Sequence, residues 1–102
     1  MGALEQTTRV ILRSGQLISV THGATVVTCL AFVRGYTASE LAGGIELGDK
    51  QVIVAGNVVF PWGDPVKNDR VTIDRKTANI MTVENVYEGA TLVRRNITVR
   101  GA

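Results

Sequence analysis

The residue types that could carry out chemistry in this 102-residue chain are few and widely separated. His22 is the single histidine and Cys29 the single cysteine. A metal site needs three or four ligands, and no second histidine or nearby cysteine is present to share a metal with His22. We therefore predict no metal site, and we expect His22 to lie in a loop, in contact with solvent.

Cys29 lies in the apolar run TVVTCLAF. Its neighbours are expected to raise the pKa of its thiol and to keep it unreactive, so a packing role is predicted. A single cysteine also allows no disulfide within the chain.

The carboxylates do not form an arrangement typical of an active site. Asp64, Asp69 and Asp74 are spread over a turn and a strand, and Glu84 and Glu88 flank a strand end. Aspartate side chains commonly serve turns by accepting hydrogen bonds from nearby backbone N–H groups. The glycine-rich stretch ELAGGIELG has neither the spacing nor the Lys-Ser/Thr ending of a phosphate-binding loop. We predict that the chain is not an enzyme and binds no cofactor.

Composition indicates a folded all-β protein. Hydrophobic residues make up 45% and charged residues 20%, and the 11 glycines lie between short runs rich in Val, Ile and Thr. No run approaches the roughly 18 apolar residues of a membrane span, and no signal peptide opens the chain. We expect one domain over residues 1–102, no membrane contact, and synthesis in a reducing cytoplasm.

Periodicity predicts six or seven short antiparallel strands, the pattern of a small closed β-barrel. The expected strands cover residues 7–13, 16–20, 25–33, 50–60, 70–74, 77–87 and 91–100. No useful helical period is recognised, apart from one turn that a capping box at Thr37 and Glu40 could start. In the last strand Val93, Ile97 and Val99 share one face, and Arg95 interrupts them.

The segment of about residues 36–50 is too long for a hairpin turn, and loops of this length are usually functional. The net charge of +2 selects no partner by itself. One alternative is a small barrel that binds nucleic acid or a peptide, with Arg9, Arg13, Arg94 and Arg100 on one face. The aromatic residues expected to stack on bases lie outside those strands.

The order of these elements resembles the small head-closure, or head–tail joining (stopper), proteins of long-tailed bacteriophages and prophages. Members typically have Tyr-x-x-x-Glu-Ile/Leu, a Gly-Asp-x-x-Val, a Pro-x-x-Gly-Asp-x-Val-x-Ile-Asp-Gly, a Val-x-x-Val strand and a final Leu-x-Val-Arg-Gly. The matching residues are Tyr36, Glu40, Leu41, Gly48, Asp49, Val52, Pro65, Asp69, Val71, Ile73, Asp74, Val83, Val86, Arg100 and Gly101. Asn68 replaces a glycine, and Arg75-Lys76 stands where a tight hairpin favours Gly or Asn, which leaves that turn type open.

The resemblance implies a ring of copies at the head–tail junction of a virion, made in the bacterial host cytoplasm. Such a ring closes the DNA-filled head and contacts a portal-side adaptor and tail proteins. A tail terminator or another neck protein is an alternative. The residues expected to make assembly contacts from the long loop are Tyr36, Glu40, Leu41, Ile45 and Leu47. Arg94 and Arg100 are the residues expected to face the channel and the packaged DNA.

Overall fold

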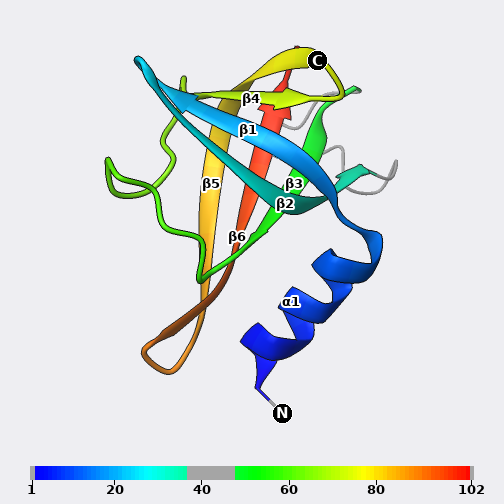
Figure 1. Cartoon of the computed structure of the whole chain (residues 1–102), viewed down its shortest axis with the longest axis vertical. Helices are drawn as coiled ribbons and strands as arrows, with labels where there is room; N and C mark the ends of the chain where they lie inside the picture. Colours follow the sequence, from blue (N-terminus) through cyan, green and yellow to red (C-terminus); the bar gives the residue numbers. More distant parts are fainter. Residues whose placement is uncertain (1, 37–47, 102) are drawn as a thin grey trace.

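The computed structural model describes residues 2–36 and 48–101, which form one helix and six strands. The elements are α1 (Ala3–Ser14), β1 (Gln16–His22), β2 (Thr25–Gly35), β3 (Lys50–Ala55), β4 (Arg70–Ile73), β5 (Lys76–Glu88) and β6 (Thr91–Arg100). The strands close into an antiparallel barrel in the order β1-β2-β3-β6-β5-β4, with β4 returning to β1. Figure 1 shows α1 outside the barrel, with the β5–β6 hairpin extending past its lower end. The predicted small all-β barrel is confirmed.

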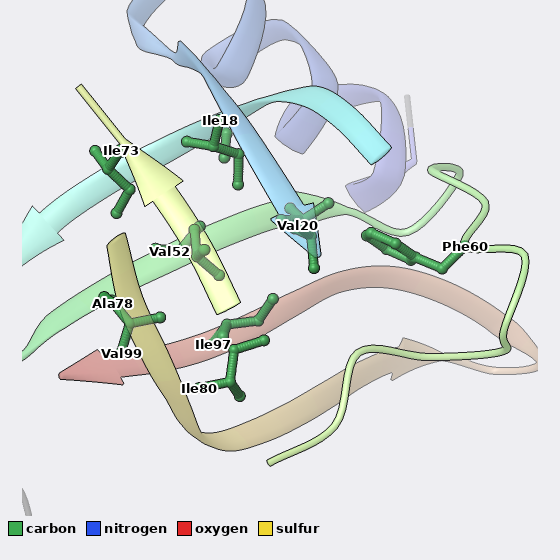
Figure 2. Packing of buried hydrophobic residues seen from close by; sticks show 12 residues of the cluster. Ile18, Val20, Val52, Phe60, Ile73, Ala78, Ile80, Ile97 and Val99 are labelled. Atoms are coloured by element: carbon green, nitrogen blue, oxygen red, sulfur yellow. The ribbon is translucent and has the colours of Figure 1, made fainter. Parts of the chain in front are cut away.

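Alternation along the strands produces the core. Twelve buried residues form one cluster inside the barrel (Figure 2). Eleven of them are Ile, Val or Ala side chains of the strands, and the twelfth is Phe60 from the loop after β3. In β6 the inward residues Val93, Ile97 and Val99 are at most 3% exposed, as the alternation predicted. Closure leaves no unpaired sheet edge among the six strands, which removes a common route to aggregation.

The first predicted strand, residues 7–13, is wrong, because residues 3–14 form helix α1. Leu4, Thr8 and Ile11 recur at helical spacing on one face, and Ile11 is the buried residue of that face. Val10 and Leu12, which a strand over residues 7–13 would place on one face, are 53% and 68% exposed in the helix. Glu5 in the first turn and Arg13 in the last complement the helix dipole. A short stretch that mixes Val, Ile and Leu fits both the two-residue period of a strand and the 3.6-residue period of a helix. Packing against the barrel favours the helix here.

Gly15 ends α1 where the chain passes tightly into β1. Its N–H donates to the carbonyl oxygen of Ile11 at 2.7 Å. A Cβ at this position would clash with that same oxygen and would lie 2.9 Å from the carbonyl oxygen of Ala31. A residue without a side chain is therefore needed for the helix to lie against β2.

The unusual turn before β5 is a two-residue hairpin. Ile73 pairs with Lys76, and the two central residues Asp74 and Arg75 have φ angles of 49° and 67°. Positive φ at both positions is what a type I′ turn requires, and Gly or Asn would adopt it with less strain than Arg75. Asn68, which stands where the resembling motif has glycine, has φ of 76°, a left-handed backbone that asparagine tolerates better than most residues.

Candidate functional site: the base of segment 37–47 and the groove beside helix α1

Segment 37–47 begins and ends on two paired strands. β2 leaves the barrel after Gly35, β3 enters at Lys50, and these two residues are partners in the ladder. The residues predicted for assembly contacts fall mostly beyond this point: Glu40, Leu41, Ile45 and Leu47 lie outside the described residues. Tyr36, the first of that set, is described and marks one side of the base.

Polar contacts hold Tyr36 against the outer surface of the barrel. Its hydroxyl lies 2.6 Å from Oγ1 of Thr98 in β6. The guanidinium of Arg34 lies 5.5 Å from the centre of the Tyr36 ring, and its Nε donates to Oε1 of Gln51 at 2.7 Å. These contacts join β2, β3 and β6 at the point where the segment starts.

The other side of the base is closed by Asp49 and Arg100. The Asp49 side chain is 1% exposed, and its two oxygens accept hydrogen bonds of 2.9 Å from Nε and Nη2 of Arg100. Gly48, just before it, has φ of 95°, a backbone conformation that favours glycine. Arg100 was expected to face packaged DNA, and the structure places its guanidinium on this buried carboxylate.

Arg94, the other residue expected to contact DNA, lies on the outward face of β6 and lines a groove. The groove has a volume of about 550 Å³ and runs between α1 and the outer faces of β2, β3 and β6. Its barrel side is formed by Phe32, Arg34, Gln51, Ile53, Arg94 and Asn96. Its helix side includes Val10 and Ile11. The structure therefore separates Arg94 from Arg100, which sequence reasoning had grouped.

The groove combines apolar walls with positive charge. Arg9 and Arg13, one turn apart on α1, line an adjoining hollow that shares Val10 with the groove. Within residues 2–36 and 48–101, the side chains of Arg9, Arg13 and Arg94 form no ion pair or hydrogen bond. Three cations therefore stand beside an apolar surface without an acidic partner in the described part of the chain.

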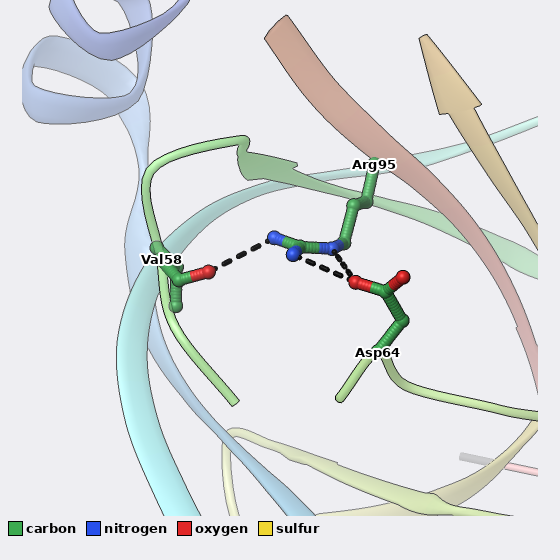
Figure 3. Close-up of polar contacts among 3 residues, drawn as sticks. All are labelled: Val58, Asp64 and Arg95. Carbon is green, nitrogen blue, oxygen red and sulfur yellow. Dashed lines mark hydrogen bonds and ion pairs between the residues drawn. The ribbon is translucent and has the colours of Figure 1, made fainter. Parts of the chain in front are cut away.

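A second polar centre inside one mouth of the barrel was not recognised from sequence. Arg95, 5% exposed, donates from Nε and Nη2 to Oδ1 of Asp64 at 3.1 and 2.8 Å. Its Nη1 donates to the carbonyl oxygen of Val58 at 3.0 Å, as Figure 3 shows. The guanidinium also lies 5.0 Å from the centre of the Phe60 ring. The sequence feature that could have indicated this centre is Arg95 itself, a charged residue at an inward position of β6. Its hydrogen bonds hold the loop after β3 against the end of the barrel.

His22 was expected in a loop and in contact with solvent. It is the last residue of β1, its side chain is 45% exposed, and it also has specific partners. Its Nδ1 lies 2.6 Å from Oδ1 of Asp69, and its ring stacks on Trp62 with centroids 5.0 Å apart. The second oxygen of Asp69 accepts the N–H of Val66 at 3.0 Å. Among the described residues, Asp69 is the sole hydrogen-bond partner of His22, and no serine, threonine or cysteine side chain is bonded to the pair. The contact joins β1 to the loop before β4.

Cys29 packs against the core from a half-buried position. Burial raises the pKa of its thiol above the ordinary 9.0, and the positive charge of Arg95 offsets part of that rise. The direction of the shift is the one expected from the apolar neighbours, and it keeps the thiol protonated at neutral pH.

Comparison with known proteins adds no relative. No protein-family model, curated protein or solved structure matches this chain. Over the described ranges, no group of three or more His, Cys, Asp or Glu side chains could hold a metal. In the same ranges, no helix has the length and apolar character needed to cross a membrane.

Proposed function

We propose that this chain is a structural component of the neck of a long-tailed bacteriophage or prophage. Copies form a ring that closes the DNA-filled head and provides the docking surface for the tail. The support is the ordered set of motifs from Tyr36 to Gly101 together with a closed barrel of the kind that the resemblance implies. A tail terminator or another neck protein remains the alternative within this class.

The observation that carries the proposal is that side-chain contacts fix the residues on both sides of segment 37–47 to the barrel. Tyr36 with Thr98, and Asp49 with Arg100, tie both ends of the segment to β6. These contacts hold the two ends of the insertion in fixed positions on the barrel, and loops positioned by a rigid scaffold often carry binding residues. A firm base is useful when the segment between the two anchors makes contacts with a neighbouring subunit, because less ordering is then required on assembly.

Charge is consistent with a ring around DNA. In a ring, each outward arginine appears once per copy, so a net charge of +2 per chain can add up to a strong local field on phosphates. Of the two arginines predicted to face the channel, Arg94 is the better candidate, because Arg100 already binds Asp49. The adaptor and tail proteins of the neck would contact the remaining surfaces of the ring.

The proposal is tested by immunogold labelling of particles from the producing strain with antibody to this chain. Gold at the junction of head and tail is the expected result. Tailed particles that never label, with the protein remaining in the cell, would reject the neck role. A second test replaces residues 38–48 with a Gly-Ser linker, which should leave the barrel folded and block particle assembly.

The groove favours one candidate function of another class, a barrel that binds a peptide or nucleic acid. Arg94, Arg9 and Arg13 supply cations beside an apolar surface. Binding of free DNA by the isolated chain, weakening steeply with salt, would support that function. Binding of DNA only by the assembled ring would support the neck role.

A further inference from the structure

We infer that the groove beside α1 is the docking site for segment 37–47 of a second copy of this chain. The inference rests on the proposed ring and names the contact that joins its subunits. A ring needs a head-to-tail contact in which one surface of each copy meets a different surface of the next. The groove supplies the receiving surface, and the segment supplies the other.

The groove is suited to an acidic, partly apolar peptide. Phe32 and Ile53 on the barrel and Val10 on the helix provide apolar surface. Arg94 projects into the same groove, and it forms no ion pair with any described residue. A carboxylate placed beside Arg94 would gain a charge-assisted hydrogen bond while its apolar neighbours left water.

The sequence of segment 37–47, TASELAGGIEL, has that chemistry. Its two charged residues, Glu40 and Glu46, are both acidic, and each is followed by a leucine. Ile45 adds a third large apolar residue. The charges of the segment and of the groove are opposite in sign, and in each of them charged groups lie next to apolar ones. Such complementarity is expected of two surfaces that contact each other.

Chain length favours a segment from another copy over the chain's own. Arg94 pairs with Ala55, five positions along β3 from Lys50, or about 17 Å at the rise of a strand. Segment 37–47 is attached at both ends, so its farthest reach is half its extended length, about 18 Å. Glu40, five positions after Gly35, comes level with Arg94 only if that part of the chain is fully extended, and Glu46, four positions before Lys50, reaches only about 14 Å. The segment of a neighbouring copy is not tied to this groove and can place either glutamate there.

The test uses a fluorescein-labelled peptide of residues 36–48, titrated with the full chain at low salt and followed by anisotropy. Saturable binding is expected. The Arg94→Gln variant should bind roughly five- to tenfold more weakly, the effect of losing about 1 kcal/mol. Arg70→Gln is the matched control, because Arg70 is exposed on β4 and does not line the groove. A peptide with Gln at positions 40 and 46 should bind as weakly to the wild-type chain as the native peptide binds to Arg94→Gln.

A second chain, with residues 38–48 replaced by a Gly-Ser linker, identifies the natural occupant. Equal peptide affinity for this chain and for wild type is expected at chain concentrations where both are monomeric, because no neighbouring copy then competes and the groove receives its ligand from outside. Binding to the linker chain alone would overturn the inference, since the chain's own segment would then fill the groove. No binding to either chain, or equal binding by Arg94→Gln, would also overturn it.

The peptide-binding experiment and the immunogold labelling can fail independently of each other. Gold-labelled necks combined with no peptide binding would discard this contact and retain the proposed function. Peptide binding by a protein absent from particles would retain the contact and discard the neck. Displacement of the peptide by short duplex DNA at equal affinity would identify the groove as a nucleic-acid site and overturn the inference.

Discussion

Asp49 and Arg100, 51 positions apart, form a two-pronged ion pair in which the carboxylate is almost completely buried. The pair joins the residue before β3 to the last residue of β6. It therefore fixes the end of segment 37–47 to the end of the barrel's final strand. Arg100 is thus placed to support the base of the segment, and Arg94 is left as the half-buried cation of the same strand face without an acidic partner among the described residues.

Replacing Arg100 with Gln should destabilise the protein by about 2 kcal/mol, because a buried carboxylate loses two charge-assisted hydrogen bonds. The melting temperature followed by circular dichroism should fall on the order of 10 °C. Arg94→Gln is the matched control and should melt within about 2 °C of wild type. Combining Arg100→Gln with Asp49→Asn should cost less than the sum of the two single changes. Additive effects would show that the two side chains are not coupled.

Arg95→Ala is expected to cost about 3 kcal/mol of unfolding free energy. The change removes a buried side chain, leaves a void under Phe60, and frees Asp64 and the carbonyl of Val58 from their bonds. Urea unfolding measures the loss. Arg95→Met restores most of the apolar volume and should recover more than half of it. If Met were as harmful as Ala, the polar bonds and not the packing would hold the loop in place.

Arg75→Gly should stabilise the protein by about 1 kcal/mol. Arg75 has φ of 67° in the β4–β5 turn, and an L-residue with a side chain is strained there by roughly 1–2 kcal/mol. Glycine relieves that strain in the folded state. It also raises the conformational entropy of the unfolded chain, which offsets part of the stabilisation. Thermal melts compare the variant with Lys76→Gly, a neighbouring change inside β5 that should destabilise. A loss of stability in Arg75→Gly would mean that the turn needs the arginine side chain.

Cys29 should react slowly with iodoacetamide in the folded protein, with a rate that is still rising at pH 9.0 and levels off only near its raised pKa. Its pKa is raised by burial, so the folded chain keeps the thiol proton at pH values where the unfolded chain has lost it. The corresponding stability is complete below pH 9 and is lost as the pH rises toward the higher folded pKa. Mass spectrometry of alkylation against pH, in buffer and in urea, separates the two curves. Identical curves would refute the shift.

Strand positions could be predicted where local alternation was strong. The bounds of β6, including the inward faces of Val93 and Ile97, agree with the prediction, because alternation depends on neighbouring residues alone. The left-handed backbone of Asn68 is likewise a local property, because asparagine tolerates that conformation better than most residues. Helix α1 was missed, because residues 7–13 fit both periods and only docking on β2, β3 and β6 favours the helix.

The sequence alone determined that this is a small antiparallel β protein with one long insertion, since hydrophobic period and turn residues act over a few positions. Tertiary structure decided which distant side chains meet: Asp49 with Arg100, Asp64 with Arg95, and the groove between α1 and Arg94. Pairs separated by 31 and 51 positions leave no local pattern. Which side chains meet depends on the order of the strands around the closed barrel, and that order is a property of the whole chain.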